Sequence, residues 1–92
     1  MLDQRPLTNE GFELEEIDGE ILLYSPTSTR SVYLNLTASL IWRLCDGVHN
    51  VGDIVKQLED AFPEAREDIA GDVIRSITLF VDNGAMRLEP AL

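Results

Sequence analysis

The fold of this chain is decided by residues 32–47, VYLNLTASLIWRLCDG. The first residues of this stretch alternate in polarity with the two-residue period of a β-strand, and the later apolar residues recur with the period of an α-helix. Asn35 stands where the period changes and can cap the helix by accepting a backbone N–H, with Thr37 as the alternative cap. Gly47 closes the helix, as glycine commonly does. The stretch therefore predicts a strand that leads directly into a helix.

The helix within this stretch is predicted to be the central, buried helix of the fold. On a helical projection its apolar residues cover most of the circumference and leave mainly Ser39 and Arg43 for water. Trp42 is expected to anchor the core, and Cys45 to pack there as a small apolar side chain.

Two more strands are predicted upstream of this stretch. Residues 12–17 and 20–24 flank Asp18-Gly19, and an Asp-Gly pair between apolar segments is a strong signal for a β-hairpin. The Ser, Pro and Thr residues of 25–28 favour a turn that returns the chain into a third strand at 31–34. The sequence thus predicts a three-stranded antiparallel meander.

Two helices and a short strand are predicted downstream. Asn50 and Asp53 form the start of a capping box for a helix over residues 51–62. A third helix is expected over residues 65–83, ended by Gly84, and its apolar arc is wider than one buried face needs, so part of it is expected to face something besides the core. Residues 86–89 alternate in polarity, as a short C-terminal wing strand would. Together these elements predict an α+β fold of the winged helix-turn-helix type.

Length and composition limit the function. The chain has 92 residues, enough for one domain, which we place at residues 12–92 after a flexible lead-in at 1–11 that shows no periodicity. A net charge of −10 argues against nucleic acid and anionic membranes as partners. One cysteine and one histidine provide no disulfide framework, metal set or catalytic group, and no apolar run approaches the about 20 residues of a membrane span. The composition predicts a cytoplasmic binding protein that is not an enzyme and has no cofactor.

Several short motifs resemble one family, the PqqD family, whose members are also called RiPP recognition elements. These motifs are Tyr33-Leu34-Asn35, the helix end Trp42-Arg43-Leu44-Cys45-Asp46-Gly47, the helix from Val51 to Leu58, Phe62-Pro63 and Asp72-Val73. The resemblance covers about residues 20–89. It implies a small winged helix-turn-helix domain that binds the leader segment of a ribosomally made precursor peptide and presents it to a modifying enzyme, often a radical SAM enzyme. In the founding case the precursor becomes the cofactor pyrroloquinoline quinone.

The resemblance also implies where the leader binds. In similar domains the leader lies between the third strand and the third helix, where it adds to the unpaired edge of the strand. By position, the implied site residues are Arg30, Ser31, Val32, Tyr33 and Leu34 on the strand, and Arg66, Ile69, Ala70, Val73 and Ile77 on the helix. The apolar members of this set have an alternative role in the core, so Tyr33 and the strand backbone are the better candidates for contact with the peptide.

Two other classes of protein remain as alternatives: a winged-helix module that docks onto another protein, and a winged-helix transcription regulator. DNA binding requires Lys or Arg on the recognition helix. The predicted third helix carries only Arg66 and Arg75 as basic residues, among four acidic ones. The regulator is therefore the weaker alternative.

Overall fold

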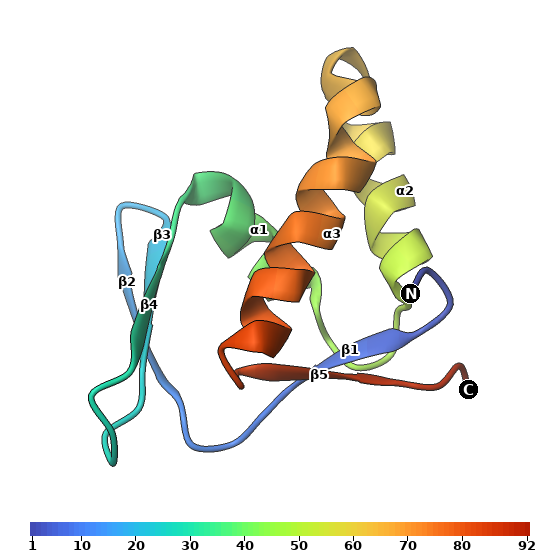
Figure 1. The fold of residues 1–92 in the computed structure, drawn as a ribbon. Helices are drawn as coiled ribbons and strands as arrows, with labels where there is room; N and C mark the ends of the chain where they lie inside the picture. The colour runs from blue at the N-terminus through green and yellow to red at the C-terminus, as the bar shows by residue number, and fades with distance from the viewer.

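A computed structural model describes all of residues 1–92 and has an α+β fold (Figure 1). In chain order the elements are β1 (Arg5–Thr8), β2 (Glu13–Ile17), β3 (Glu20–Tyr24), β4 (Ser31–Leu34), α1 (Leu36–Leu44), α2 (Val51–Ala61), the 3-10 turn η1 (Pro63–Ala65), α3 (Arg66–Asp82) and β5 (Met86–Glu89). The predicted fold class is confirmed: a three-stranded antiparallel sheet is followed by three helices and a C-terminal strand.

Strands β2, β3 and β4 form the predicted meander, in that order across the sheet. Asp18 and Gly19 both have positive φ, 52° and 84°, as the two central residues of a type I′ hairpin turn require. Along β4 the side chains alternate, with Val32 and Leu34 buried and the two residues between and before them exposed. One face of the sheet therefore packs on the helices and the other faces solvent.

The first eleven residues differ from the expectation of a flexible lead-in. β1 pairs with β5 in an antiparallel ribbon that runs from Arg5 opposite Glu89 to Thr8 opposite Met86. This ribbon crosses below the helices in Figure 1, and both chain termini lie on the side of the molecule opposite the sheet. The predicted C-terminal strand is thus present, but its partner is an N-terminal segment whose sequence carries no strand periodicity of its own.

The N-terminal segment also completes the start of α2. The first N–H groups of a helix have no partner within the helix. Here the Val51 N–H donates to the carbonyl of Gln4 at 3.0 Å, and the Gly52 N–H donates to the carbonyl of Leu2 at 2.8 Å. The capping box predicted for α2 is also present: the side chains of Asn50 and Asp53 each accept the backbone N–H of the other residue.

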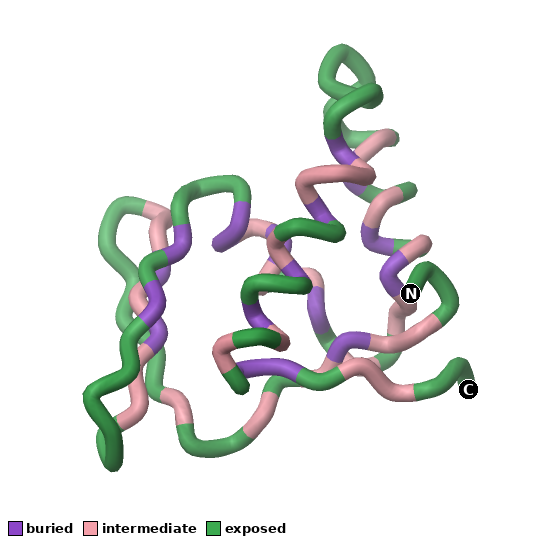
Figure 2. Tube along the Cα trace, viewed as in Figure 1, coloured by how far each residue is buried: buried purple, intermediate pink, exposed green.

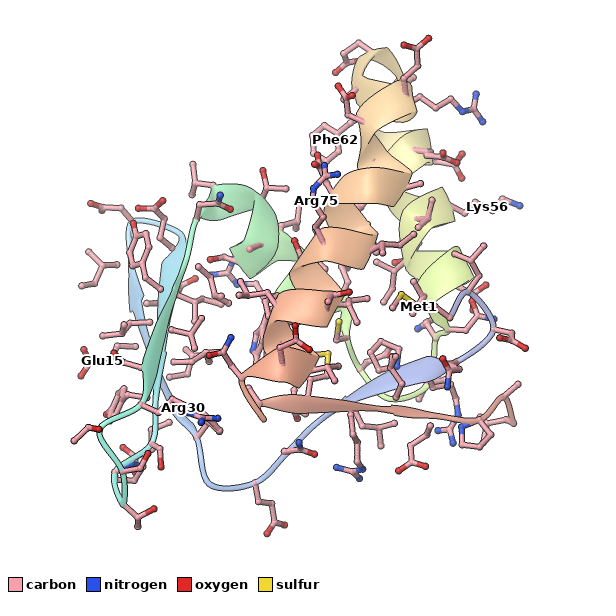
Figure 3. All side chains as sticks on the ribbon, in the orientation of Figure 1. Met1, Glu15, Arg30, Lys56, Phe62 and Arg75 are labelled. Atoms are coloured by element: carbon pink, nitrogen blue, oxygen red, sulfur yellow. The ribbon has the colours of Figure 1, made fainter.

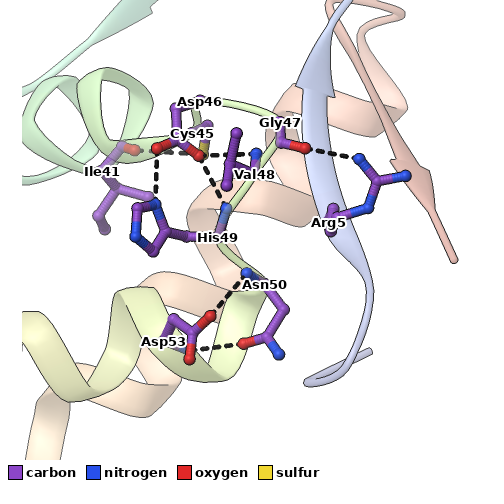
Figure 4. A network of polar contacts seen from close by, with 9 residues as sticks. All are labelled: Arg5, Ile41, Cys45, Asp46, Gly47, Val48, His49, Asn50 and Asp53. Carbon is purple, nitrogen blue, oxygen red and sulfur yellow. Dashed lines mark hydrogen bonds and ion pairs between the residues drawn. The ribbon is translucent and has the colours of Figure 1, made fainter. Parts of the chain in front are cut away.

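The turn between α1 and α2 is organised by one carboxylate (Figure 4). Asp46 accepts the backbone N–H groups of Val48 and His49, each at 2.9 Å, and contacts the His49 ring at 2.6 Å. α1 ends at Leu44, and Gly47 follows in the turn with φ of +79°. A Cβ on this glycine would lie 3.1 Å from the side chain of Leu7, so the turn needs glycine for both its backbone conformation and its close approach to β1.

The surface of α1 is a second departure from the sequence analysis. Ser39, expected to face water, is 0% exposed, whereas Leu36 is 60% exposed. The Ser39 hydroxyl accepts the Ile21 N–H at 2.9 Å and donates to the Leu34 carbonyl at 3.0 Å. It therefore bridges the ends of β3 and β4 and fixes them to α1.

The core lies where α1, α2 and α3 meet the inner face of the sheet and β5. α3 contributes Ile69, Val73, Ile77 and Phe80 to it. Trp42 packs edge-to-face on Phe80, with ring centroids 5.1 Å apart, and so meets the core as expected. Figure 2 shows exposed chain at the tip where α2, η1 and α3 join and along the turn after β3. None of the helices is both long and apolar enough to span a membrane.

Candidate functional site

The free edge of β4 is the feature from which the candidate site is built. β4 is the last strand of its sheet and pairs only with β3. In an antiparallel ladder, only every second residue points its N–H and C=O toward the neighbouring strand. The Ser25 N–H donates to the Arg30 carbonyl at 3.1 Å, and the pair at the other end of the ladder is Ile21 with Leu34. Arg30, Val32 and Leu34 therefore point their backbone N–H and C=O groups toward β3. The same groups of Ser31 and Tyr33 point away from the sheet, toward the free edge.

Helix α3 lies across from this edge, and two surface hollows open between them. The first, which we call the Arg75 hollow, lies between the start of α1 and the middle of α3 and is lined by Asn35, Thr37, Ala38, Asp72, Arg75, Ser76 and Leu79. The second, the Arg30 hollow, lies between the turn after β3 and the end of α3 and is lined by Phe12, Ser25, Ser28, Thr29, Arg30, Asn83 and Gly84. The two hollows therefore mark the two ends of the strip between β4 and α3.

Two arginines set the polar character of this strip. Arg30 donates to the carbonyl of Asn83 at 3.0 Å, which ties the turn before β4 to the end of α3. Arg75 pairs with Asp72 one turn away on the same helix at 2.5 Å. Leu79 lies between Arg75 and Asn83 along α3, and its apolar side chain is 40% exposed. Figure 3 shows Arg75 on the side of α3 nearer to the sheet, with Arg30 close to the end of the helix.

The structure separates the site residues expected on the strand into two groups. Ser31 and Tyr33 are exposed, and Arg30 lines a hollow beside them. Val32 and Leu34 are buried in the core, which agrees with the alternative role given to them from the sequence. Only the backbone edge, Ser31, Tyr33 and Arg30 are therefore accessible to a partner.

The residues expected on the helix are mostly buried. Ile69, Val73 and Ile77 are buried in the core, Ala70 is half-buried, and Arg66 is exposed at the start of α3, the end of the helix remote from the Arg30 hollow. The side chains of α3 that line the Arg75 hollow were not identified from the sequence: Asp72, Arg75, Ser76 and Leu79. These residues follow one another at helical spacing beside the buried stripe of α3. A helical projection that includes polar as well as apolar residues would have placed them on one face.

The aromatic side chain on β4 turns to the outer face of the sheet. Tyr33 is 62% exposed, and its hydroxyl donates to the carboxylate of Glu20 on β3. The hydrogen bond to this carboxylate, and to a smaller extent desolvation and the carboxylate charge, raises the pKa of Tyr33. Tyr24 makes the same kind of bond to Glu13 at 2.9 Å, and the pKa of Tyr24 is raised for the same reasons. Both phenols therefore stay protonated donors near neutral pH.

The single cysteine and histidine lie in the turn after α1, away from the β4 edge. Burial, with a smaller contribution from the charge of Asp46, raises the pKa of Cys45 to about 12, which keeps the thiol protonated and unreactive. Backbone N–H bonds from His49 and Val48 lower the pKa of Asp46 to about 2. These groups hold the turn, and no cluster of three or more His, Cys, Asp or Glu side chains is arranged to hold a metal ion.

Comparisons with known proteins agree with this architecture. No curated protein matches the chain in sequence. Among solved structures, "TbiB1 in Complex with the TbiA(beta) Leader Peptide" is similar with a TM-score of 0.72 and 16% identity, covering 87% of this chain and 93% of that chain, a likeness of fold. The family profile of coenzyme PQQ synthesis protein D (PqqD) matches residues 20–85, a span that runs from β3 to the residue before β5. With most of its length matched in this way, the chain belongs to the PqqD family.

Proposed function

We propose that this protein binds the leader segment of a ribosomally synthesised precursor peptide by adding it as a strand to β4. The observation that carries the proposal is the free edge of β4, at which Ser31 and Tyr33 offer N–H and C=O groups with no partner strand. An extended peptide can pair with such an edge through its main chain. Membership of the PqqD family supports this role, and the solved protein of similar fold is described in complex with a leader peptide.

The edge and the helix have separate tasks in this proposal. Main-chain pairing accepts many sequences, whereas the side chains of the strip choose among them. Leu79 offers an apolar contact, and Arg30 and Arg75 offer guanidinium groups to acidic or carbonyl oxygens of the peptide. We place strand pairing at the β4 edge with the two hollows, whose linings do not include Ile69, Val73 or Ile77.

The bound leader is then presented to a modifying enzyme, for which a radical SAM enzyme is our first candidate. Holding the precursor close to the enzyme raises its effective concentration without chemistry by this domain. We accordingly propose a non-catalytic role, and the high pKa of Cys45 accords with it because a protonated thiol is a poor nucleophile. We place this encounter in the cytoplasm, where precursor peptides are made.

Calorimetric titration with synthetic leader regions of short precursor peptides encoded beside the gene tests the proposal. The informative variant is Tyr33→Pro, because the Tyr33 N–H points to the free edge and its loss leaves the bonds between β3 and β4 intact. Tyr33→Ala is the matched control, since it removes the side chain and its bond to Glu20 but keeps the N–H.

We expect saturable one-to-one binding to the wild-type protein and to Tyr33→Ala. Tyr33→Pro should bind about tenfold more weakly, the effect of about one hydrogen bond together with the steric clash of the ring. Circular dichroism checks that each variant is folded. Equal affinity of the folded Tyr33→Pro variant would rule out strand addition at this edge, and the absence of binding by any neighbouring leader would overturn the proposed function itself.

A further inference from the structure

An apolar pocket lies beyond the end of β4, between α1, the end of α2 and α3. Eight of its ten lining residues are hydrophobic, and its volume is about 270 Å³. The lining residues are Leu36, Thr37, Leu40, Ile41, Leu58, Phe62, Ala65, Ile69, Asp72 and Val73. We call this the Phe62 pocket. Its volume lies just below the about 300 Å³ at which pockets for small molecules begin, which suits a single side chain.

Two large apolar side chains stand open at the mouth of the Phe62 pocket. Leu36, the first residue of α1, is 60% exposed, and Phe62, at the end of α2, is 44% exposed. Both side chains belong to the lining of the pocket and are open to solvent. An apolar group that entered the pocket would remove both side chains from water.

The Phe62 pocket is continuous with the strip beside β4. Thr37 and Asp72 line both this pocket and the Arg75 hollow, so the two share a wall. From the level of Leu79 to that of Asp72, α3 rises about 10 Å, which an extended peptide covers in about three residues. A peptide that continues from β4 past Asn35 thus needs about three residues to cross the Arg75 hollow and reach the pocket. Figure 3 shows Phe62 and Arg75 on the same side of α3.

The rim of the Phe62 pocket is acidic. Asp72 belongs to its lining, Asp68 lies one turn before it on α3, and Glu64 lies in η1; the last two are exposed. Asp72 is offset by its pair with Arg75, and Arg66 follows the lining residue Ala65. The excess negative charge of the rim therefore comes from Glu64, Glu67 and Asp68, in a chain whose net charge is −10. A cationic group beside the entering apolar side chain would therefore be attracted to this rim.

We infer that the Phe62 pocket binds an apolar side chain of the leader peptide, and that a Lys or Arg within two residues of it pairs with the acidic rim. This inference rests on the proposed function, because it assigns a second contact to the peptide held at β4. The preferred peptide has a segment that pairs with β4 as a strand. About three residues before or after this segment it has an apolar residue, and next to that residue a basic one.

Selection from a phage-displayed library of random dodecamer peptides on the wild-type protein tests the inference. We expect the selected peptides to share one large apolar residue with Lys or Arg nearby. A selected peptide is then synthesised with that apolar residue replaced by glycine, and its affinity is measured by calorimetry. The replacement should weaken binding about tenfold or more.

Variants of the protein test whether the apolar residue of the selected peptide binds in the Phe62 pocket. Ala65→Trp places an indole at the Phe62 pocket without altering the Arg75 hollow and should weaken binding of the selected peptide by a similar factor. Thr78→Trp is the matched control, since Thr78 is also exposed on a helix but lines none of the hollows, and it should bind as the wild type does.

The outcomes separate the two proposals. If neither the neighbouring leaders nor any library peptide binds, peptide binding itself fails, and the inference fails with it. If peptides are selected but tolerate glycine in place of their apolar residues, the Phe62 pocket is not used and the inference is overturned, while strand addition at β4 stands. The glycine test does not depend on the folding of any protein variant.

Discussion

Replacing Ser39 with alanine removes a buried hydroxyl that joins three elements. In the wild-type protein this hydroxyl accepts the Ile21 N–H at 2.9 Å and donates to the Leu34 carbonyl at 3.0 Å, with the serine 0% exposed. In Ser39→Ala both backbone groups lose their partner at the end of the β3–β4 ladder. We therefore expect the variant to be less stable and the end of β4, next to the candidate site, to be less firmly held.

The magnitude follows from the two bonds. An unsatisfied buried donor or acceptor costs about 1–3 kcal/mol, and partial closure of the ladder will recover some of this cost. Alanine is the better helix former by up to about 0.7 kcal/mol, which offsets part of the loss. We expect a net decrease of about 2 kcal/mol in the free energy of unfolding, or about 10 °C in the midpoint of thermal unfolding for a domain of this size.

Urea unfolding followed by circular dichroism measures the change, and Ser76→Ala is the matched control. Ser76 lies on α3, is half-buried and makes no hydrogen bond through its side chain, so its substitution tests the helix propensity alone. Amide hydrogen exchange of Ile21 gives a local readout and should accelerate in Ser39→Ala only. If the two variants are equally stable within about 0.5 kcal/mol, the ladder closes without the serine and the bridge contributes nothing.

Three further substitutions or deletions test the parts that frame the site. Gly47→Ala should lower the free energy of unfolding by about 1 kcal/mol or more, because φ is +79° and a Cβ would lie 3.1 Å from Leu7; urea titration measures this, and a neutral result would contradict the strained turn. The pKa of Asp46 is lowered from 3.8 to about 2, so its ionised form stabilises the fold above pH 4 and loses this effect as the pH falls toward 2. Asp46→Asn should therefore be less stable than the wild type at pH 6, with a difference that disappears in acid titrations by pH 2; a constant difference would exclude the charge as its cause. Deleting residues 1–9 should cost at least about 2 kcal/mol, because it exposes Met86 on β5, and an unchanged thermal midpoint would show that the β1 ribbon is dispensable.

The free edge of β4 could be predicted from the sequence more directly than the side chains that surround it. The edge of β4 followed from the order of the meander, because a strand that precedes the helices and ends the sheet must leave one side unpaired. On α3 the apolar residues Ile69, Val73 and Ile77 were expected to contact the leader; all three are buried, and Ile69 and Val73 also line the Phe62 pocket. Apolar periodicity identifies the face of a helix that packs, whereas the face of α3 that lines the Arg75 hollow is mostly polar and carries no such period.

Local signals in the sequence determined the elements of this protein. Capping by Asn35, the change of period at this residue and the Asp18-Gly19 turn depend on residues close together in the chain. Strands β2 to β5, the helices and the free edge of β4 could therefore be predicted. Tertiary structure alone decided the pairing of β1 with β5, the burial of Ser39, and the Phe62 pocket. Each of these depends on contacts between segments far apart in the chain, which periodicity within one segment cannot encode.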